Sequence, residues 1–550
     1  MYQDQKIYLG KSGDDKVCID LSMANRHGLI AGATGTGKTT TLKVMAEAFS
    51  DAGVPVFLAD LKGDLSGLSQ NGYENEDLKA RIDSFGLREE GFDFRSYPTV
   101  FWDVYGEKGL SLRTTVSEMG PLLLGRILDL NDTQMDVLTV VFKIADDEGL
   151  LLIDTKDLRS MLTYVSENSA EYSLKYGNIA KKSLGAIQRS VIALEDQGGE
   201  LFLAEPALNI TDWLSADING RGTINILDCQ KLSLNPTMYS TFLLWMLSEL
   251  YETLPEVGDG AKPKVVFFFD EAHMLFDSAS KNLLQKIEQV VKLIRSKGVG
   301  IYFITQNPAD IPDGVLAQLG NKVQHALHAY TPAEQRGIRA AANSFRVNPE
   351  FDTAEALQNL AIGEALVSVL DAEGIPTIVQ KTRILPPQSL MGPIDDAVRT
   401  GMIQSCALYP KYSQFVDRDS AFEFLSRLEQ TKQENAQREA EEKERMKEEA
   451  AAEKERMRQE AAAEKERLKQ EAAEERERQK EEAAAIKAAE AEEKRKKQAV
   501  SSVASSAAGT IGREVGNLLG KTVGGSFGKR LGGNVGATLG RGILKTLFKS

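Results

Sequence analysis

Short apolar runs that end in small or polar residues recur through the first four hundred residues. Five of them have the length and character of strands buried on both faces of a sheet, at residues 27–31, 54–60, 222–228, 264–270 and 298–305. Between them lie longer stretches in which apolar residues return every three or four positions, as at 40–49, 237–254 and 282–295. This alternation predicts an α/β fold with a mostly parallel sheet.

Weaker patterns flank these runs. Residues 6–9 and 16–21 alternate well enough to predict a small hairpin before the first core strand. Later in the chain, the pattern predicts a strand, a helix and another strand at 322–328, 331–342 and 365–370. The long segment 65–222 is dominated by helical patterns apart from a strand at 98–105, and we interpret it as a mostly helical insertion.

The C-terminal part has a different kind of sequence. Residues 434–497 repeat every eleven positions and consist largely of Ala, Glu, Lys and Arg, which predicts a long charged helix of roughly 90 to 100 Å at about 1.5 Å per residue. Each repeat offers one Met or Leu at most, so a lone helix and a weak, slightly right-handed coiled coil both fit. From Gly512 to Gly540 a glycine returns at every fourth position. That basic tail fits a disordered segment, self-association or an anionic membrane surface.

These patterns divide the chain into five parts. A split α/β core is expected at 1–64 and 223–395, a helical insertion at 65–222, a helical end of the core at 396–430, the charged helix at 431–498 and the glycine-rich basic tail at 499–550.

One glycine-rich stretch follows the first core strand and precedes a helix. Residues 32–39 fit G-x-x-x-x-G-K-[ST], the P-loop pattern, in which backbone N–H groups surround a phosphate. Lys38 is expected to reach the β and γ phosphates, and the Thr39 hydroxyl to ligate Mg²⁺. The predicted cofactors are therefore ATP and Mg²⁺. The residues expected to bind the nucleotide are Gly32, Ala33, Thr34, Gly35, Thr36, Gly37, Lys38, Thr39 and Thr40.

Two adjacent carboxylates end the most apolar strand. Asp270 and Glu271 follow Val-Val-Phe-Phe-Phe, a Walker B pattern. We expect Asp270 to hold Mg²⁺ and Glu271 to polarise the water that attacks the γ-phosphate. Because the chain contains a single P-loop, a second half-site must come from another subunit, which favours a ring.

Three other strand or helix ends carry candidate chemistry. Asp60 ends a strand that we expect to lie beside the P-loop strand, where it faces the nucleotide or simply caps a turn. Gln306 ends another strand and is placed to orient water or to sense phosphate. Arg295 ends a helix, where it either complements the helix dipole or acts as an arginine finger on a neighbouring subunit. The second choice of finger is Arg336 or Arg339.

Two histidines and the overall composition suggest further limits. His325 and His328 are three positions apart, which places them on opposite faces of a strand, so we do not expect them to ligate a metal. The net charge is −14, and residues 1–430 alone carry −18. Any nucleic-acid binding must therefore use a local basic surface. Three scattered cysteines, no signal-peptide pattern and no apolar run of about 18 residues favour the cytoplasm.

These motifs together resemble the HerA/FtsK superfamily of ring-forming P-loop ATPases, and most closely the bacterial HerA-like proteins of the YjgR type. The resemblance covers roughly residues 20–385. It is carried by residues 25–28 ahead of the P-loop, 60–63, 270–273 and 305–308. It implies a RecA-like fold, a homohexamer and a DNA translocase or helicase. It also implies roles for five residues, namely Glu271 and Gln306 in catalysis, Asp60 at the Mg²⁺ and water site, Arg26 near the nucleotide and Arg295 as the finger acting in trans.

Two departures from the superfamily leave the substrate open. Only about 27 residues precede the P-loop strand, where HerA translocases have a large β-barrel, and neither the membrane spans nor the DNA-reading domain of FtsK is visible. A motor that threads DNA through a central channel is one hypothesis. The other is an ATP-gated switch or scaffold, whose C-terminal tail recruits a protein partner or a membrane surface.

Overall fold

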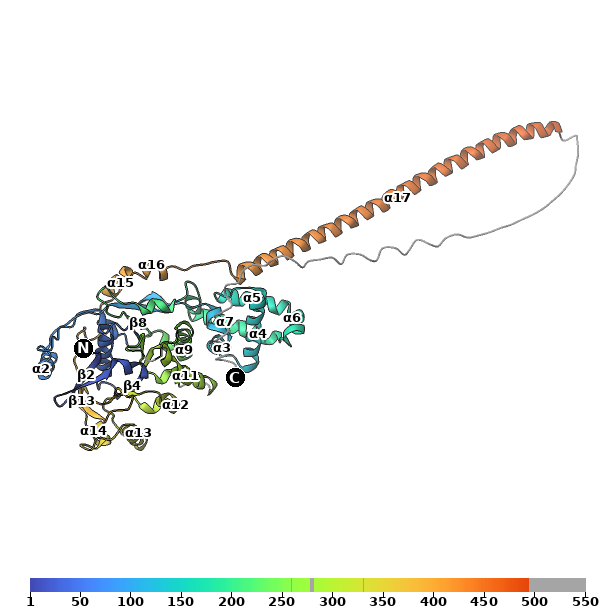
Figure 1. Cartoon of the computed structure of the whole chain (residues 1–550). Coiled ribbons are helices and arrows are strands. Elements are labelled where there is room, and N and C mark those ends of the chain that lie inside the picture. The colour runs from blue at the N-terminus through green and yellow to red at the C-terminus, as the bar shows by residue number, and fades with distance from the viewer. Residues whose placement is uncertain (259, 277–280, 330, 494–550) are drawn as a thin grey trace. The chain divides into compact units, whose positions relative to one another are not determined.

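The computed structural model describes residues 1–258, 260–276, 281–329 and 331–493 (Figure 1). The chain separates into two units, of which the first holds residues 1–426 and the second begins at Arg427. In the first unit one sheet contains every strand: β1 Tyr2–Gln3, β2 Lys6–Ser12, β3 Asp15–Asp20, β4 Gly28–Ala31, β5 Val56–Asp60, β6 Thr99–Asp103, β7 Leu110–Ser111, β8 Ile224–Asp228, β9 Val265–Phe269, β10 Val299–Thr305, β11 Asn321–Gln324, β12 Glu364–Ser368 and β13 Gln380–Ile384.

The order of the strands shows a parallel core with an antiparallel flank. The sheet runs β1-β2-β13-β12-β11-β4-β10-β9-β5-β8-β6-β7, with β3 paired to β2. All neighbours from β11 to β7 are parallel, whereas those from β11 back to β1 are antiparallel. The five predicted core strands are confirmed as β4, β5, β8, β9 and β10, and the predicted hairpin is β2 with β3. The α/β fold with a mostly parallel sheet is therefore confirmed.

One neighbour relationship was predicted wrongly. We expected β5, which ends at Asp60, to lie beside the P-loop strand β4, but β10 and β9 lie between them. The chain reaches β9 and β10 only after the insertion, and these apolar strands then take the centre of the sheet. Strand β13 was not predicted, because only Thr382 and Ile384 of its five residues are buried.

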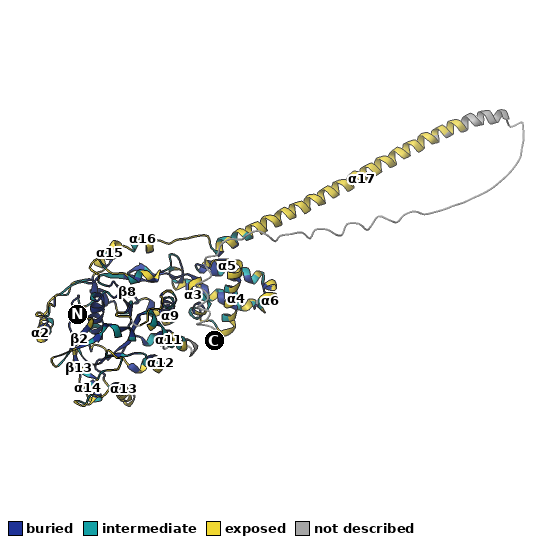
Figure 2. Ribbon diagram, in the orientation of Figure 1, coloured by how far each residue is buried: buried dark blue, intermediate teal, exposed yellow. Residues whose placement is uncertain are grey.

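Helices cover both faces of the parallel core. Phe268 of β9 and Tyr302 of β10 lie against Phe49 of α1, with ring centroids 6.2 and 6.1 Å from it. On the opposite face, Phe267 and Phe57 pack against Trp213, with ring centroids at 6.1 and 4.5 Å. This burial on both sides explains why the core strands are almost continuously apolar. Figure 2 shows the strands in dark blue beneath a partly exposed layer of helices.

The first unit contains these helices: α1 Lys38–Asp51, α2 Glu76–Phe85, α3 Val116–Ile127, α4 Asp132–Glu148, α5 Thr155–Glu167, α6 Ser169–Tyr176, α7 Lys181–Asp196, α8 Gly199–Phe202, α9 Pro236–Thr253, α10 His273–Phe276, α11 Lys281–Ile294, α12 Asp313–Leu316, α13 Pro332–Asn343, α14 Thr353–Gln358, α15 Asp396–Ser405 and α16 Tyr409–Tyr412. Helices α2 to α8 fall within residues 65–222, but β6 from the same segment pairs with β8 in the central sheet. None of the helices among the described residues is long and apolar enough to cross a bilayer.

The last described element is α17, Ala421–Glu493. Its start is fixed inside the first unit, because Asp157 of α5 accepts hydrogen bonds from the Ser420 hydroxyl at 2.5 Å and the Phe422 N–H at 2.8 Å. From Arg427 onward the helix carries i,i+4 ion pairs such as Lys443–Glu439, and Met446 and Met457 are about two-thirds exposed. The long charged helix is thus present as far as Glu493. Residues 494–498 and the predicted glycine-rich tail lie outside the described residues.

Candidate functional site

The P-loop links the carboxyl end of β4 to the first turn of α1. Gly32, Gly35 and Gly37 have φ angles of 152°, 79° and 117°, in the region that favours glycine. A Cβ on Gly32 would lie 2.5 Å from the Cβ of His325, so the position also requires glycine for space. Beyond Gly37, the N–H groups of the first helical turn have no acceptor within α1 and carry its positive end. The loop is therefore built as a cradle for an anion.

Neighbouring elements hold the cradle from below. His325 Nδ1 donates to the carbonyl of Glu364 at 2.9 Å, which leaves Nε2 to accept from the Thr41 hydroxyl at 2.9 Å. Burial lowers the pKa of His325 to about 4. The Gly363 N–H donates to the Thr36 carbonyl at 3.1 Å. His325 is thus a neutral support, while His328 is exposed beyond the end of β11.

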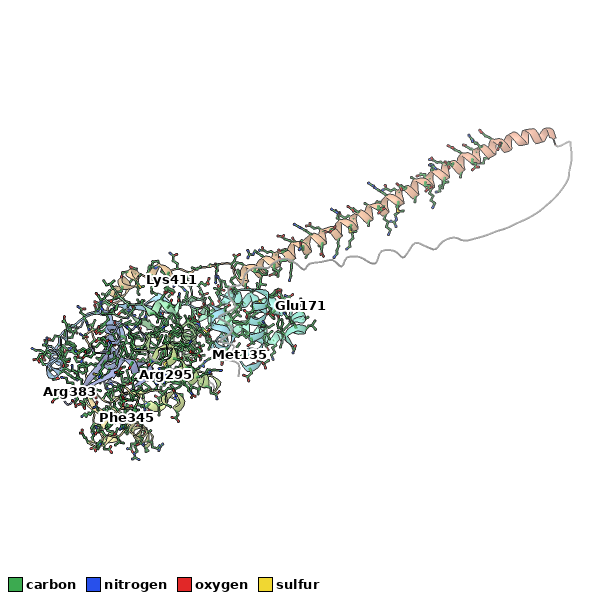
Figure 3. All side chains as sticks on the ribbon, in the orientation of Figure 1. Met135, Glu171, Arg295, Phe345, Arg383 and Lys411 are labelled. Atoms are coloured by element: carbon green, nitrogen blue, oxygen red, sulfur yellow. The ribbon has the colours of Figure 1, made fainter. Side chains whose placement is uncertain are left out.

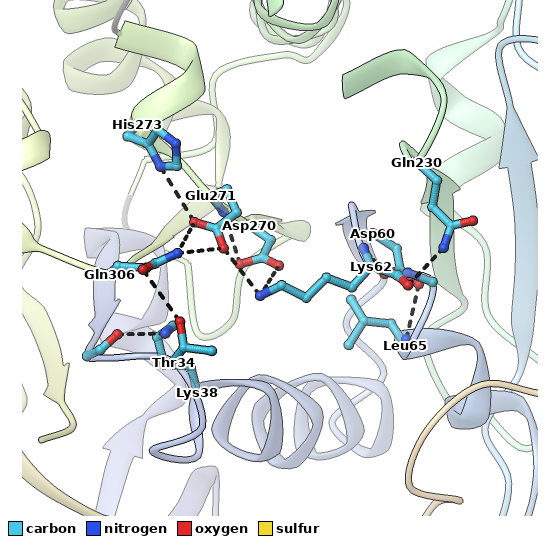
Figure 4. Close-up of polar contacts among 12 residues, drawn as sticks. Thr34, Lys38, Asp60, Lys62, Leu65, Gln230, Asp270, Glu271, His273 and Gln306 are labelled. Carbon is cyan, nitrogen blue, oxygen red and sulfur yellow. Dashed lines mark hydrogen bonds and ion pairs between the residues drawn. The ribbon is translucent and has the colours of Figure 1, made fainter. Parts of the chain in front are cut away.

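Lys38 lies over the mouth of the loop. Its ammonium donates to the carbonyls of Gly32 at 2.6 Å and Ala33 at 3.1 Å (Figure 4). Burial and then the charge of Lys62 lower the pKa of Lys38, while Glu271 and Asp270 act in the opposite direction. Thr39 and Thr40 follow it in the first turn and are half-buried, and Thr34 and Gly35 are exposed at the loop tip. The lysine is therefore close to both carboxylates of the predicted Walker B pattern.

The two carboxylates lie at the end of β9. The Asp270 side chain accepts from the Glu271 N–H at 3.0 Å, and burial raises the pKa of Asp270 to about 6. Glu271 has a φ of 45°, which is rare for a residue with a side chain, and its own side chain is nearly buried. Gln306 Nε2 donates to both Glu271 carboxylate oxygens, at 3.3 and 3.4 Å. The structure thus brings Lys38, Asp270, Glu271 and Gln306 to one edge of the sheet.

Lys62 is a member of this group that the sequence analysis did not find. Its ammonium lies 3.2 Å from Glu271 Oε1 and 3.9 Å from Asp270 Oδ2 (Figure 4). Burial disfavours its charge, but Asp270 and Glu271 outweigh that effect and raise the pKa of Lys62. The sequence signals were its position two residues after the acid that ends β5 and its place within residues 60–63, one of the stretches that carry the superfamily resemblance.

Asp60 has its hydrogen bonds within its own loop. Its carboxylate accepts from the backbone N–H groups of Gly63 at 2.7 Å and Leu65 at 3.0 Å. Burial, followed by the charge of Asp64, raises the pKa of Asp60 to about 7. The geometry matches the turn-capping alternative, and its effect is to fix the backbone that carries Lys62.

Two of the candidate arginines lie at the opposite edge of the sheet. Arg26 immediately precedes His27 and β4, and Arg295 precedes β10, so both are at the amino ends of strands whose carboxyl ends form the site. His27 joins these two places, because its Nε2 donates to the Val291 carbonyl at 2.8 Å and its Nδ1 accepts from the Ile301 N–H at 3.0 Å. Arg295, which is labelled in Figure 3, is exposed.

The second-choice fingers lie elsewhere. Arg336 and Arg339 are both exposed on α13, which follows β11.

The length of the strands separates Arg26 and Arg295 from the P-loop. The four residues of β4 span about 13 Å at ~3.3 Å per residue. Neither Arg26 nor Arg295 is therefore close to the P-loop of its own chain.

The residues present fit a magnesium nucleotide. A Cβ on Gly32 would meet His325, so only glycine lets the loop take this shape, and Lys38 supplies a cation at the mouth of the loop. The nearby donors are oxygens, namely the Thr39 hydroxyl and the Asp270 carboxylate, which is the donor chemistry that Mg²⁺ prefers.

Comparisons with known proteins agree with this arrangement. A family model described as "Helicase HerA-like C-terminal" matches residues 5–534. Among curated proteins, the "DNA double-strand break repair helicase HerA" of Saccharolobus solfataricus is 25% identical over 382 residues, 66% of each chain. The protein of the same name from Sulfurisphaera tokodaii is 22% identical over 397 residues, 69% of this chain and 70% of the relative. The chain thus spans slightly less than two thirds of the first relative.

Two solved structures match more weakly. The plasmid coupling protein TrwB in complex with ADP and Mg²⁺ matches with a TM-score of 0.47 and 14% identity, covering 71% of this chain and 94% of that one. VirB4 of Thermoanaerobacter pseudethanolicus matches with a TM-score of 0.46 and 18% identity, covering 70% and 97%. At TM-scores below 0.5 this likeness supports no statement about chemistry.

Proposed function

Because the chain belongs to the HerA-like helicase C-terminal family, as the match over residues 5–534 shows, we propose that it is an ATP-hydrolysing ring motor that translocates DNA. The observation that carries this proposal is the convergence of Lys38, Asp270, Glu271 and Gln306 at one edge of the sheet. These groups are the ones that phosphoryl transfer needs, since the protein contributes positioning and electrostatic stabilisation more than covalent chemistry.

Each side chain has a separate task in hydrolysis. Backbone N–H groups of residues 32–40 bind the phosphates, and Lys38 leaves its carbonyl partners for the β and γ oxygens. Thr39 and Asp270 would hold Mg²⁺, which neutralises phosphate charge when bound. Glu271 takes the proton of the attacking water, and Gln306 keeps that carboxylate oriented. Asp60 acts indirectly, by fixing the loop beside the site.

The placement of the arginines supports self-association. Arg26 and Arg295 lie at the amino ends of β4 and β10, away from their own P-loop, so a phosphate that they contact belongs to another copy. Contacts that join the carboxyl edge of one copy to the amino edge of the next are head-to-tail, and such contacts form a ring when the rotation between successive copies closes. We propose a homohexamer in which Arg295 is the finger. Arg336 and Arg339 are the alternatives, and the position of Arg26 favours the same role in trans.

DNA is proposed as the substrate because the aligned relatives are named as DNA helicases. With −18 on residues 1–430, the body of the protein repels DNA overall, so binding depends on basic side chains that line a channel. The three cysteines are all free, which suits a reducing compartment such as the cytoplasm.

The experiment is a measurement of ATP turnover by the full chain with duplex DNA, with single-stranded DNA and without DNA, alongside the native mass. We expect a hexamer whose turnover rises with DNA and disappears in Lys38→Ala. Equal turnover under all three conditions would reject DNA as the substrate, and a monomer without turnover would reject the motor.

A second candidate function follows from α17. The helix is exposed from Glu429 to Glu475, so it is a spacer that presents the segment after it. In this alternative, ATP sets the state of a scaffold whose tail binds a protein partner or an anionic membrane surface. Deletion of residues 431–550 distinguishes the two. A motor keeps DNA-stimulated turnover without them, whereas the scaffold keeps turnover but loses its recruitment.

A further inference from the structure

The ammonium of Lys62 lies where the chemistry of the two carboxylates is expected to take place. It is 3.2 Å from Glu271 Oε1 and 3.9 Å from Asp270 Oδ2. The lysine side chain is 46% exposed, whereas those of Asp270 and Glu271 are 14% and 12% exposed. A mobile, accessible cation therefore faces two largely buried anions.

This contact opposes the role of Glu271. Oε1 receives Lys62 and Gln306 at 3.2 and 3.3 Å, and Oε2 receives Gln306 and His273 at 3.4 and 3.5 Å. A cation at this distance stabilises the charged carboxylate and weakens its attraction for a proton. Glu271 can act as an efficient general base only when the Lys62 ammonium is drawn elsewhere.

The backbone around Lys62 is fixed by hydrogen bonds, whereas its side chain is held only at its ammonium end. Asp60 accepts from the N–H groups of Gly63 and Leu65, and Gln230 Nε2 donates to the Lys62 carbonyl at 2.8 Å. The ammonium is carried on a flexible four-carbon stem. Its positive charge is also close enough to Lys38 to lower the pKa of the Lys38 ammonium. Two ammonium groups that approach one another in this way are both stabilised by a polyanion between them.

We propose that Lys62 is a second phosphate-binding lysine, which holds Glu271 in an ion pair until the terminal phosphate of a nucleoside triphosphate takes its ammonium. The proposal rests on the proposed function, because it names a further residue at the same site. No bond forms or breaks in this exchange. A diphosphate lacks the terminal group, so it leaves Lys62 on Glu271, and the exchange separates the triphosphate state from the diphosphate state before hydrolysis.

The test compares the affinity of the full chain for Mg·ATPγS and Mg·ADP by equilibrium titration. Lys62→Met removes the charge and keeps the length of the side chain, and Lys62→Arg keeps the charge. Lys231→Met is the matched control, because Lys231 is a similarly exposed lysine at the same sheet edge that pairs with Glu107. We expect Lys62→Met to weaken ATPγS binding by about tenfold or more and to change ADP binding by less than about twofold, since a charge-assisted hydrogen bond is lost only with the triphosphate. Lys62→Arg keeps most of the preference, and Lys231→Met leaves it unchanged.

A second readout does not involve nucleotide. Without the ammonium, Asp270 and Glu271 attract a divalent cation more strongly, so Mn²⁺ titrated into the protein alone is expected to bind more tightly to Lys62→Met than to Lys231→Met. An unchanged ratio of ATPγS to ADP affinity in Lys62→Met, or an equal loss for both nucleotides, would overturn the role of Lys62. Failure of the proposed function looks different, because the unsubstituted chain is then a monomer without ATP turnover, whatever its ratio of ATPγS to ADP affinity.

Discussion

Gln306 and Glu271 face each other from neighbouring parallel strands, and the amide nitrogen of Gln306 donates to both carboxylate oxygens at 3.3 and 3.4 Å. Strands β10 and β9 pair in register, with Phe303 opposite Phe269, so the two side chains are placed by the sheet and not by a flexible loop. The amide oxygen of Gln306 accepts a hydrogen bond from the hydroxyl of Thr34, at the tip of the P-loop, at 3.5 Å. A substitution of Gln306 therefore removes contacts both to the Glu271 carboxylate and to the P-loop.

Removal of the Gln306 amide should reduce hydrolysis more than binding. In Gln306→Ala we expect kcat to fall by roughly 10²-fold, because Glu271 loses the group that orients it, while the affinity for ATPγS changes little. Gln306→Glu should be worse, since it places a like charge against Glu271. Single-turnover hydrolysis together with ATPγS titration measures both effects. A loss of affinity equal to the loss of kcat would contradict this role.

The opposite placement of cradle and arginine predicts complementation between two inactive variants. Lys38→Ala removes the phosphate lysine and Arg295→Ala removes the proposed finger. If Arg295 acts in trans, a mixture of the two contains interfaces in which an intact cradle meets an intact arginine, and turnover returns. Turnover is measured for each variant and for the mixture after exchange of subunits. A mixture as inactive as its components would place the finger elsewhere, with Arg336 and Arg339 next to be substituted.

The glycines of the P-loop should differ in their tolerance. A Cβ on Gly32 meets the Cβ of His325 at 2.5 Å, whereas one on Gly35 meets nothing within 4 Å. Gly32→Ala should therefore abolish nucleotide binding by pushing the loop away from His325. In Gly35→Ala the left-handed backbone costs about 1 kcal/mol but the cradle remains. Nucleotide titration and thermal unfolding of both variants test this, and equal damage from the two substitutions would refute it.

The sequence predicted most of the strands because burial on both faces leaves a nearly unbroken apolar run, as in β9 and β10. It also identified Lys38, Asp270 and Glu271, since each belongs to a motif whose chemistry needs that spacing. The order of β5, β10 and β9 could not be predicted in the same way. Each of these strands is apolar throughout, so no pattern of side chains distinguishes one neighbour from another.

Lys62 and His325 were missed for a related reason. Each acts through a contact with a residue more than two hundred positions away in the chain, Lys62 with Glu271 and His325 with Thr41. Sequence spacing carries no trace of such contacts. For Asp60 the alternative of a turn cap was already visible, and the hydrogen bonds from Gly63 and Leu65 match it.

His325 should make stability depend on pH. Burial lowers the pKa of His325 to about 4, from an ordinary value of 6.5. Between these two pH values the ring is protonated in the unfolded chain and neutral in the folded chain. The contribution of this ring to the free energy of unfolding is therefore complete above pH 6.5 and is lost as the pH falls toward 4, by about 3 kcal/mol at most. We expect the difference in unfolding free energy between the unsubstituted chain and His325→Asn to shrink from pH 7.5 to pH 5 in urea titrations. A constant difference would show that the ring is not the group that titrates.

Asp157 should hold the start of α17. Its buried carboxylate accepts from Ser420, Phe422 and the N–H groups of Ile153 and Asp154. Asp157→Ala removes this acceptor from the three backbone N–H groups, while the Ser420 hydroxyl keeps Glu423, at a cost of roughly 2–4 kcal/mol. We expect faster proteolysis near residues 413–421, with Asp132→Ala, an exposed acid in the first turn of α4, as the control. Equal cleavage of both variants would argue against the anchor.

The His27 ring joins the last turn of α11 to β10. It lies at the edge of the sheet where Arg26 and Arg295 precede β4 and β10. The same strands end at the phosphate cradle and at Gln306. Each strand therefore connects a nucleotide-binding end to an end that carries an arginine. In a subunit built this way, the bound nucleotide can affect one neighbouring subunit, and the nucleotide of the other neighbour can affect this one. Communication around a closed assembly would then have a direction, clockwise or anticlockwise, that is fixed by the handedness of the fold.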